Sequence, residues 1–123
     1  ARVPPYHVAG DPWRYGDYIR NSAAELMIAK GMYVEANSGW FSDRSICYLA
    51  SGRPVLAQDT GLADLLPTGE GLLTFTTLEG AIEAAVAVRR EPCRHQRAAR
   101  RLGEECFECS TVLSSVARKL DLH

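Results

Sequence analysis

The chain has 123 residues, a formal net charge of −1 at pH 7 and 24% charged residues. This length fits one domain with its own core and is too short for two Rossmann-like halves. The small net charge gives no electrostatic case for nucleic acid or an anionic membrane surface as a partner. No apolar run approaches the ~20 residues of a membrane span, and no stretch has the order of a signal peptide. The four cysteines lack a paired spacing, so we expect a reducing compartment, the cytoplasm.

Residues 1–10 differ in character from the rest of the chain. The sequence begins at Ala1 without an initiator Met, and two consecutive prolines favour extended backbone, so this stretch is expected to be linker-like. We therefore interpret the chain as a fragment of a longer protein, either a truncated product or an excised domain. Residues 11–123 are expected to form a single domain that opens with a helix, capped by Asp11 and ending near Asn21.

A short apolar segment follows at residues 25–29, before a Lys-Gly pair. Its length suits a buried strand better than a helix. Residues 32–34 either extend this segment or form a second strand.

The middle of the chain gives the sharpest local signals. Ser42 is a good N-cap for a helix over residues 43–51, and an aspartate in its first turn suits the helix dipole. Gly52 is expected to end that helix, because glycine tolerates the left-handed conformation. Pro54 cannot extend the helix, and the apolar run at residues 55–57 predicts a buried strand.

The C-terminal half continues the alternation of helix and strand. We expect a helical turn at residues 62–65 and a strand at residues 72–75. Three helices should follow. The first is opened by a Thr76-x-x-Glu79 capping box, the second begins at Pro92, and the third is capped by Ser110. The expected apolar faces of these helices are Leu78, Ile82, Ala85 and Val86, then Ala98, Ala99, Leu102 and Cys106, then Val112, Leu113, Val116 and Leu120. The pattern predicts an α/β fold, a Rossmann-like parallel sheet flanked by helices, with a helical C-terminal tail.

Two loops, one before the helix at residues 43–51 and one after the strand at residues 55–57, could line a ligand site. In open α/β sheets, ligands bind beyond the carboxyl ends of the strands, and helix N-termini can hold phosphate. Ser42 and Ser45 would offer hydroxyls, Arg44 a forked cation and Gly39 an unobstructed backbone. Capped helices and Gly-Pro turns occur in any α/β protein, however, so a purely structural reading stays open.

The segment Gly-Trp-Phe-Ser-Asp-Arg-Ser at residues 39–45 and the segment Gly-Arg-Pro-Val-Leu-Ala-Gln-Asp-Thr-Gly at residues 52–61 resemble a known family. They are similar to the donor-binding segment of bacterial glycosyltransferase-like proteins of the GT-B fold, and the likeness continues through residues 66–73 and the helical tail. The resemblance implies half of a GT-B fold, a nucleotide-sugar-binding domain. Its partners would be a nucleoside diphosphate sugar and an N-terminal Rossmann-like domain that the chain lacks. No cofactor or metal is implied.

By that resemblance, the domain would hold the donor while acceptor and catalytic base come from the other half, so no catalytic residue is assigned here. The implied donor-binding residues are Gly39, Trp40, Ser42, Asp43, Arg44, Ser45, Asp59, Thr60 and Gly61. Many members of the wider family carry two glutamates in this segment, one of which holds the donor ribose. Those positions fall on Gly39 and Cys47 here, and neither is a carboxylate.

Two other interpretations remain open at this stage. The missing glutamates fit a non-catalytic Rossmann-like binding or interaction module, so whether the chain belongs to an enzyme is undecided. A small zinc module is the other, with Cys93, His95, Cys106 and Cys109 as ligands of the types that zinc accepts. One unbroken helix over residues 92–108 would place the two ligand pairs roughly 20 Å apart, too far for one ion.

Overall fold

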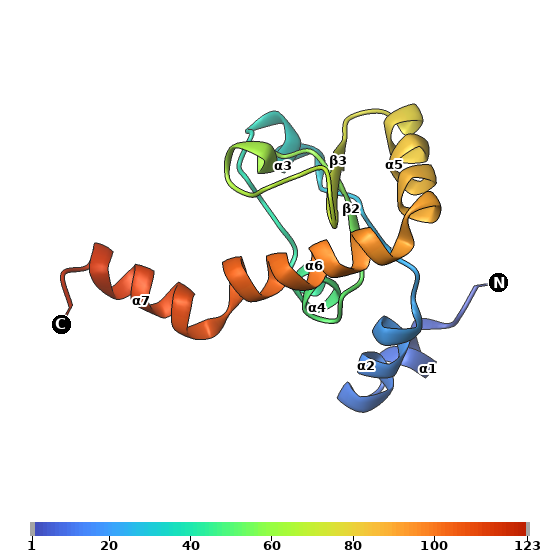
Figure 1. The fold of residues 1–123 in the computed structure, drawn as a ribbon, viewed down its shortest axis with the longest axis horizontal. Helices are drawn as coiled ribbons and strands as arrows, with labels where there is room; N and C mark the ends of the chain where they lie inside the picture. The colour runs from blue at the N-terminus through green and yellow to red at the C-terminus, as the bar shows by residue number, and fades with distance from the viewer. Residues whose placement is uncertain (1, 123) are drawn as a thin grey trace.

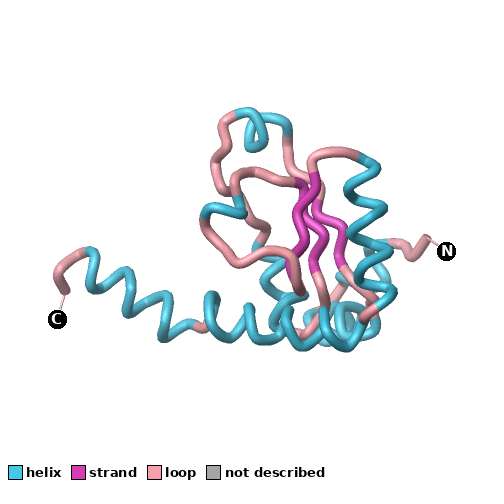
Figure 2. Tube along the Cα trace, turned by 45° about the horizontal axis from the view of Figure 1, so that its top comes forward, coloured by secondary structure: helices cyan, strands magenta, loops and turns pink. Residues whose placement is uncertain are grey.

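The computed structural model describes residues 2–122, so Ala1 and His123, the outer ends of the two expected segments, lie outside the described residues. Its centre is a parallel sheet of three strands in the order β1-β2-β3 (Figures 1 and 2). The strands are β1 (Glu25–Met27), β2 (Val55–Gln58) and β3 (Leu72–Phe75). The helices are α1 (Pro5–Ala9), α2 (Pro12–Asn21), α3 (Gly31–Glu35), α4 (Asp43–Ala50), η1 (Leu62–Asp64), α5 (Leu78–Arg90), α6 (Pro92–Phe107) and α7 (Cys109–Lys119).

Both faces of the sheet carry apolar side chains, because successive residues of a strand point to opposite faces. On one face, Val55 and Leu72 pack with residues of α4 and α6, among them Leu49 and Leu102. On the other face, Leu56, Leu73 and Phe75 pack against Ala84 and Val88 of α5. The expected α/β class with a parallel sheet and flanking helices is therefore confirmed for the described residues.

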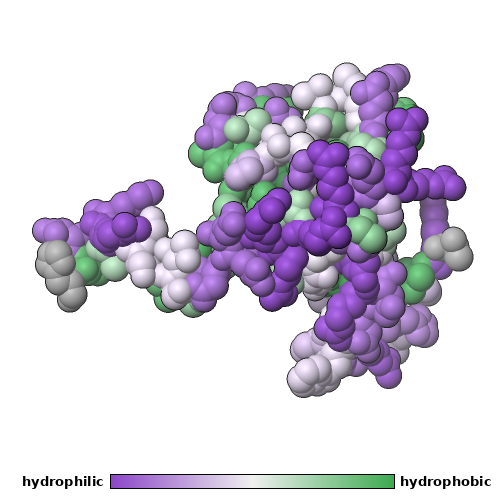
Figure 3. Space-filling model, in the orientation of Figure 1, coloured by the Kyte–Doolittle hydropathy of each residue, from purple (hydrophilic) through white to green (hydrophobic). Residues whose placement is uncertain are grey.

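The helix, turn and strand in the middle of the chain form as predicted. The Ser42 hydroxyl accepts a hydrogen bond from the Arg44 backbone N–H at 3.2 Å, which caps α4. Gly52 has a φ of +67°, the left-handed conformation that ends the helix. The strand β2 begins one residue after Pro54. The helical tail is also present, and Figures 1 and 3 show α7 extending away from the rest of the fold.

Two expected elements have a different structure. Residues 32–34 lie in the helix α3 and form no second strand. The chain leaves the sheet at Ala29, whose N–H bonds to the side chain of Gln58 instead of to strand backbone. The start of the chain is not wholly extended either, because residues 5–9 form α1. Pro5 occupies the first helical position, where its missing N–H costs nothing and its fixed φ suits a helix.

Two helix caps and two helix faces also differ from the predictions, since the expected apolar face of α7 is exposed at Val112, Leu113, Val116 and Leu120. The cap of α5 is Thr77, whose hydroxyl accepts from the Gly80 N–H at 3.1 Å, one residue after the expected Thr76. The cap of α7 is Glu108, which accepts from the Thr111 N–H at 3.1 Å, because the helix begins at Cys109, before the expected cap Ser110. The face of α5 that packs on the sheet carries alanines and Val88, since small residues allow a close approach, and the expected Leu78, Ile82, Ala85 and Val86 are exposed.

The helix α6 lies against the loop before β3 at very short range. The Gly71 φ is +74°, and a Cβ atom there would lie 2.7 Å from the Ala98 carbonyl carbon in the α6 backbone. Its N–H donates to Nδ1 of the buried His95 at 3.2 Å, and its carbonyl accepts from Val55. This one residue therefore joins the helix to the central strand.

We expect Gly71→Ala to destabilise the domain by more than about 4 kcal/mol, because the methyl group meets helix backbone that cannot move aside. Gly69→Ala is the matched control. Gly69 also has a positive φ, +106°, but nothing lies within 4 Å of a Cβ placed there. Its cost is the conformational strain alone, about 1–2 kcal/mol. Urea unfolding of both variants measures the difference, and equal losses would contradict the packing argument.

Candidate functional site

Four of the nine predicted donor-binding residues meet beyond the carboxyl end of β2. The Gly39 N–H donates to the Thr60 carbonyl at 2.6 Å, and the Thr60 hydroxyl donates to the Trp40 carbonyl at 2.8 Å. Gly61 follows Thr60 with a φ of +94°, and a Cβ there would lie 2.7 Å from the side-chain oxygen of Asn37. The two loops that the sequence predicted to line one crevice therefore do touch.

Most polar groups at this junction already have partners inside the protein. The Asp59 carboxylate accepts from the Gly61 and Leu62 N–H groups, at 2.9 Å and 3.2 Å. Thr60 is fully buried. Trp40 stacks on Tyr33 with ring centroids 5.0 Å apart and planes 10° apart. What remains open to a ligand here is the partly exposed face of that aromatic pair and the outer side of Asp59.

The other predicted residues lie at the start of α4. Ser42 is buried and its hydroxyl caps the helix, while Ser45 is fully buried and its hydroxyl has no hydrogen-bond partner among the described residues. Neither hydroxyl faces solvent, so neither is placed to contact a bound phosphate. Asp43 and Arg44 are exposed. Of this group, these two side chains are the ones available to a ligand.

An ion pair ties Arg44 to the first strand. Its Nε atom donates to a carboxylate oxygen of Glu25, a residue that is 6% exposed, while the Arg44 side chain is 49% exposed. The hydrogen bond that Arg44 donates to Glu25 raises the pKa of the Arg44 guanidinium. Glu25 pairs with Val55 at the amino end of the sheet, whereas Asp59 follows the carboxyl end of β2. The predicted site therefore divides into two groups, with the guanidinium at one end of the sheet and the loop 59–61 at the other.

A small cavity lies beside this guanidinium. Its volume is about 220 Å³, and its lining residues are Tyr15, Asp43, Arg44 and Cys47. Burial raises the pKa of Tyr15. The cavity is smaller than the ~300–1,000 Å³ of most small-molecule sites, so it suits one group of a larger ligand. Sequence reasoning missed Tyr15 and Glu25, because nothing local places α2 and β1 beside the start of α4.

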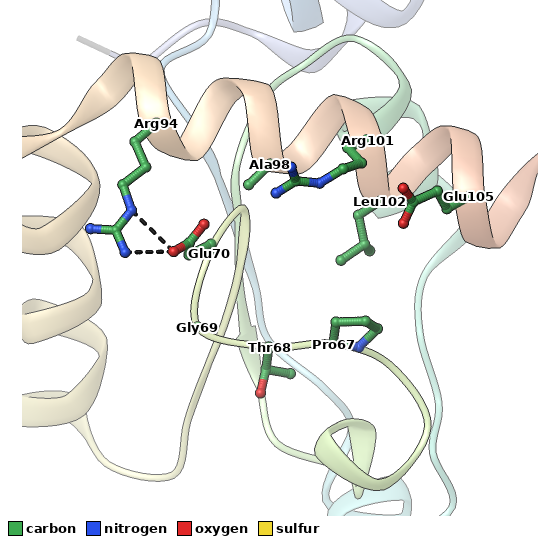
Figure 4. Close-up of a pocket in the computed structure, with 9 residues that line it drawn as sticks. All are labelled: Pro67, Thr68, Gly69, Glu70, Arg94, Ala98, Arg101, Leu102 and Glu105. Carbon is green, nitrogen blue, oxygen red and sulfur yellow. Dashed lines mark hydrogen bonds and ion pairs between the residues drawn. The ribbon is translucent and has the colours of Figure 1, made fainter.

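A larger cavity, of about 490 Å³, lies between α6 and the loop that precedes β3 (Figure 4). Its lining residues are Pro67, Thr68, Gly69, Glu70, Arg94, Ala98, Arg101, Leu102 and Glu105. The Arg94 guanidinium donates to Glu70 at 3.1 Å from Nε, and a second nitrogen, Nη2, bonds to the same oxygen. Two carboxylates and two guanidinium groups face this space, so the charges of its wall balance. The local sequence feature that indicates a turn beside this cavity is Gly-Glu-Gly at residues 69–71.

The four candidate zinc ligands do not meet. The helix α6 runs unbroken from Pro92 to Phe107, which places Cys93 and Cys106 about 20 Å apart along its axis. His95 uses Nδ1 to accept the Gly71 N–H. Residues 2–122 contain no group of three or more His, Cys, Asp or Glu side chains that could hold a metal ion.

Comparison with protein-family models, with curated proteins and with solved structures finds no match to this chain. Within residues 2–122, no helix has the length and apolar character needed to cross a membrane.

The Glu70–Arg94 contact gives a direct test of the larger cavity's geometry. Hydrogen bonding to Arg94 lowers the pKa of the Glu70 carboxyl below its ordinary value of 4.5. The stabilising effect of the pair is therefore present above pH 4.5 and is lost as the pH falls through the lowered pKa. We expect Arg94→Ala to raise the pKa of Glu70 toward 4.5 in a carboxyl NMR titration. The control is Arg97→Ala on the same helix. An unchanged Glu70 pKa in Arg94→Ala would contradict the contact.

Proposed function

We propose that this domain is the donor-binding half of a glycosyltransferase of the GT-B type. The intact enzyme would move a sugar from a nucleoside diphosphate donor to an acceptor hydroxyl. The observation that carries the proposal is the arrangement of Arg44, a half-exposed guanidinium anchored by a buried carboxylate at the start of a capped helix. The likeness of residues 39–45 and 52–61 to the donor-binding segment supports it.

The chemistry that such a site supplies is stabilisation of the leaving group. Breaking the bond between sugar and diphosphate leaves negative charge on phosphate oxygens, and fixed positive groups lower the energy of that state. An α-helix leaves its first N–H groups without partners inside the helix. The Ser42 hydroxyl accepts from the N–H of Arg44 and Ser45 is fully buried, so the N–H of the exposed Asp43 remains for an anion. With the Arg44 guanidinium, it would carry out the role that a metal ion has in other transferases.

The exposed side of the sheet supports the expectation of a second domain or of further strands. The strand β1 lies at an edge of the sheet, and Leu26 and Ile28, on it and just after it, are 57% and 60% exposed. A mainly apolar cavity of about 430 Å³, lined in part by Ala24, Pro54 and Leu56, lies on the same side. Exposed apolar strands at a sheet edge are ordinarily covered. We propose that the missing N-terminal Rossmann-like part belongs to the intact protein.

The setting that fits this proposal is the cytoplasm. The cysteines at positions 47, 93, 106 and 109 are all free. A chain with four free thiols is suited to a reducing compartment.

A second candidate is a Rossmann-like interaction module that has lost donor binding. Three hydroxyls of the predicted set, those of Ser42, Ser45 and Thr60, are buried. Positions 39 and 47 lack the carboxylates that many family members use for the donor ribose. A module of this kind would keep the fold and bind a protein partner instead of a nucleotide.

Calorimetric titration with uridine and guanosine diphosphates separates the two candidates. If the domain holds the donor diphosphate, we expect one of them to bind with an affinity of about 0.1–1 mM, weak because half of the cleft is present. Arg44→Ala should weaken that binding about tenfold or more, since a charge-assisted contact to phosphate is lost.

Arg118→Ala, which removes a guanidinium from the distant α7 tail, is the control and should bind as the unchanged chain does. No heat and no thermal shift with either diphosphate at millimolar concentration would favour the interaction module. Binding that survives Arg44→Ala would remove the phosphate assignment.

A further inference from the structure

Glu25 is the one buried carboxylate among the described residues, at 6% exposure. A buried charge is costly unless it is paired and hydrogen-bonded. Its register partner in β2 is Val55, which pairs in turn with Leu72 in β3, and both are fully buried and apolar. This row of the sheet therefore accepts apolar side chains, and the fold itself does not call for a carboxylate at position 25.

The contacts of Glu25 are incomplete as a structural ion pair. One carboxylate oxygen accepts from Nε of Arg44, and the other is buried with no hydrogen-bond partner among the described residues. A pair that serves stability alone is best made bidentate, with both oxygens bonded to two guanidinium nitrogens. Replacing a buried pair by apolar residues is often neutral or stabilising, so stability is a weak reason for this one.

What the contact does achieve is orientation. A guanidinium has five N–H donors, one on Nε and four on the two Nη nitrogens. Glu25 occupies the Nε donor, and within residues 2–122 no ion pair or hydrogen bond of Arg44 uses either Nη atom. The side chain is 49% exposed and lines the 220 Å³ cavity. The pair of Nη atoms is the part that binds phosphate oxygens bidentately.

We propose that Glu25 is a positioning residue: it holds Arg44 by Nε so that the two Nη atoms present a fixed anion-binding edge to the cavity between α2 and α4. The inference rests on the proposed function, because it assigns a role within the same diphosphate site. It also extends that site to a residue 19 positions away in the sequence, on a different element.

Glu25 has two opposing effects on a bound anion. The direction of the change in anion affinity when Glu25 is replaced therefore tests the proposal. Its negative charge repels a phosphate and weakens binding. Its hold on Arg44 removes side-chain freedom that binding would otherwise have to remove, which strengthens binding. If Glu25 acts through charge alone, Glu25→Gln tightens anion binding. If it acts as a positioning residue, the same change weakens anion binding.

The experiment titrates the unchanged chain and Glu25→Gln with inorganic pyrophosphate and with uridine diphosphate in the calorimeter. We expect Glu25→Gln to weaken both about three- to tenfold. Glu83→Gln on the exposed face of α5 makes the same change in net charge far from Arg44 and should leave both affinities within twofold. An affinity for Glu25→Gln that is unchanged or tighter overturns the proposal.

A double-mutant cycle with Arg44→Ala provides the readout that a merely structural role would not give. In the Arg44→Ala background, Glu25→Gln should cause no further loss, because the edge that Glu25 positions is gone. An equal loss in both backgrounds would mean that Glu25 supports the fold in general, and it overturns the proposal. The dependence of affinity on salt should fall for Arg44→Ala, which removes a positive charge from the site, but not for Glu83→Gln.

Arg44→Lys keeps the test valid if Glu25→Gln does not fold. Lysine retains a cation for Glu25 but lacks the planar pair of Nη atoms. We expect a melting temperature close to that of the unchanged chain and about tenfold weaker pyrophosphate binding. Full affinity in Arg44→Lys overturns the proposal. If the unchanged chain binds neither probe, the proposed function fails and this inference fails with it, whereas binding that ignores Glu25 leaves the proposed function standing.

Discussion

An ion pair between the half-exposed Arg44 and the buried Glu25 joins the first strand of the sheet to the helix that carries the candidate phosphate ligand. Glu25 holds Arg44 near the start of α4 from β1, and α6 packs against the end of α4, where Gly103 lets the two helix backbones approach closely at Leu49 and Ala50. The same α6 holds the loop before β3 through Gly71. The position of Arg44 is thus set by the packing of the whole sheet and not by its own helix alone. A site built on such a support can be rigid before its ligand arrives, which lowers the entropy that binding removes.

The features that were predicted correctly from the sequence are those that depend only on neighbouring residues. The cap at Ser42, the left-handed Gly52 and the apolar run of β2 need only their neighbours, and each was found as expected. Residues 32–34 were misplaced because strand-like composition does not reveal that the chain has already left the sheet at Ala29. The site was only half predictable for a similar reason. Residues close in sequence were expected to act together, but the contact between Glu25 and Arg44 draws the guanidinium to the amino end of the sheet, and no spacing rule encodes that contact.

The physical state of the predicted residues refines the functional proposal. The hydroxyls that the sequence predicted as phosphate contacts are buried or cap a helix. In the proposed site, the contacts to an anion would therefore come from Arg44 and from the backbone at the start of α4. The aromatic pair of Tyr33 and Trp40 and the Asp59 turn lie at the other end of the sheet, where a base or a sugar would have to reach. A donor that spans both groups must be extended, and under this proposal its remaining contacts would come from the proposed N-terminal Rossmann-like part.

The central claim is that a diphosphate binds at the start of α4. The most direct measurement is an NMR titration of the ¹⁵N-labelled chain with uridine diphosphate, observing the backbone amides and the arginine Nε–H signals. The account predicts saturable shifts at Asp43, Arg44 and Ser45, including the Arg44 Nε–H, with smaller changes at residues 59–61. Shifts confined to residues 59–61, or no shifts at any of these positions, would contradict it.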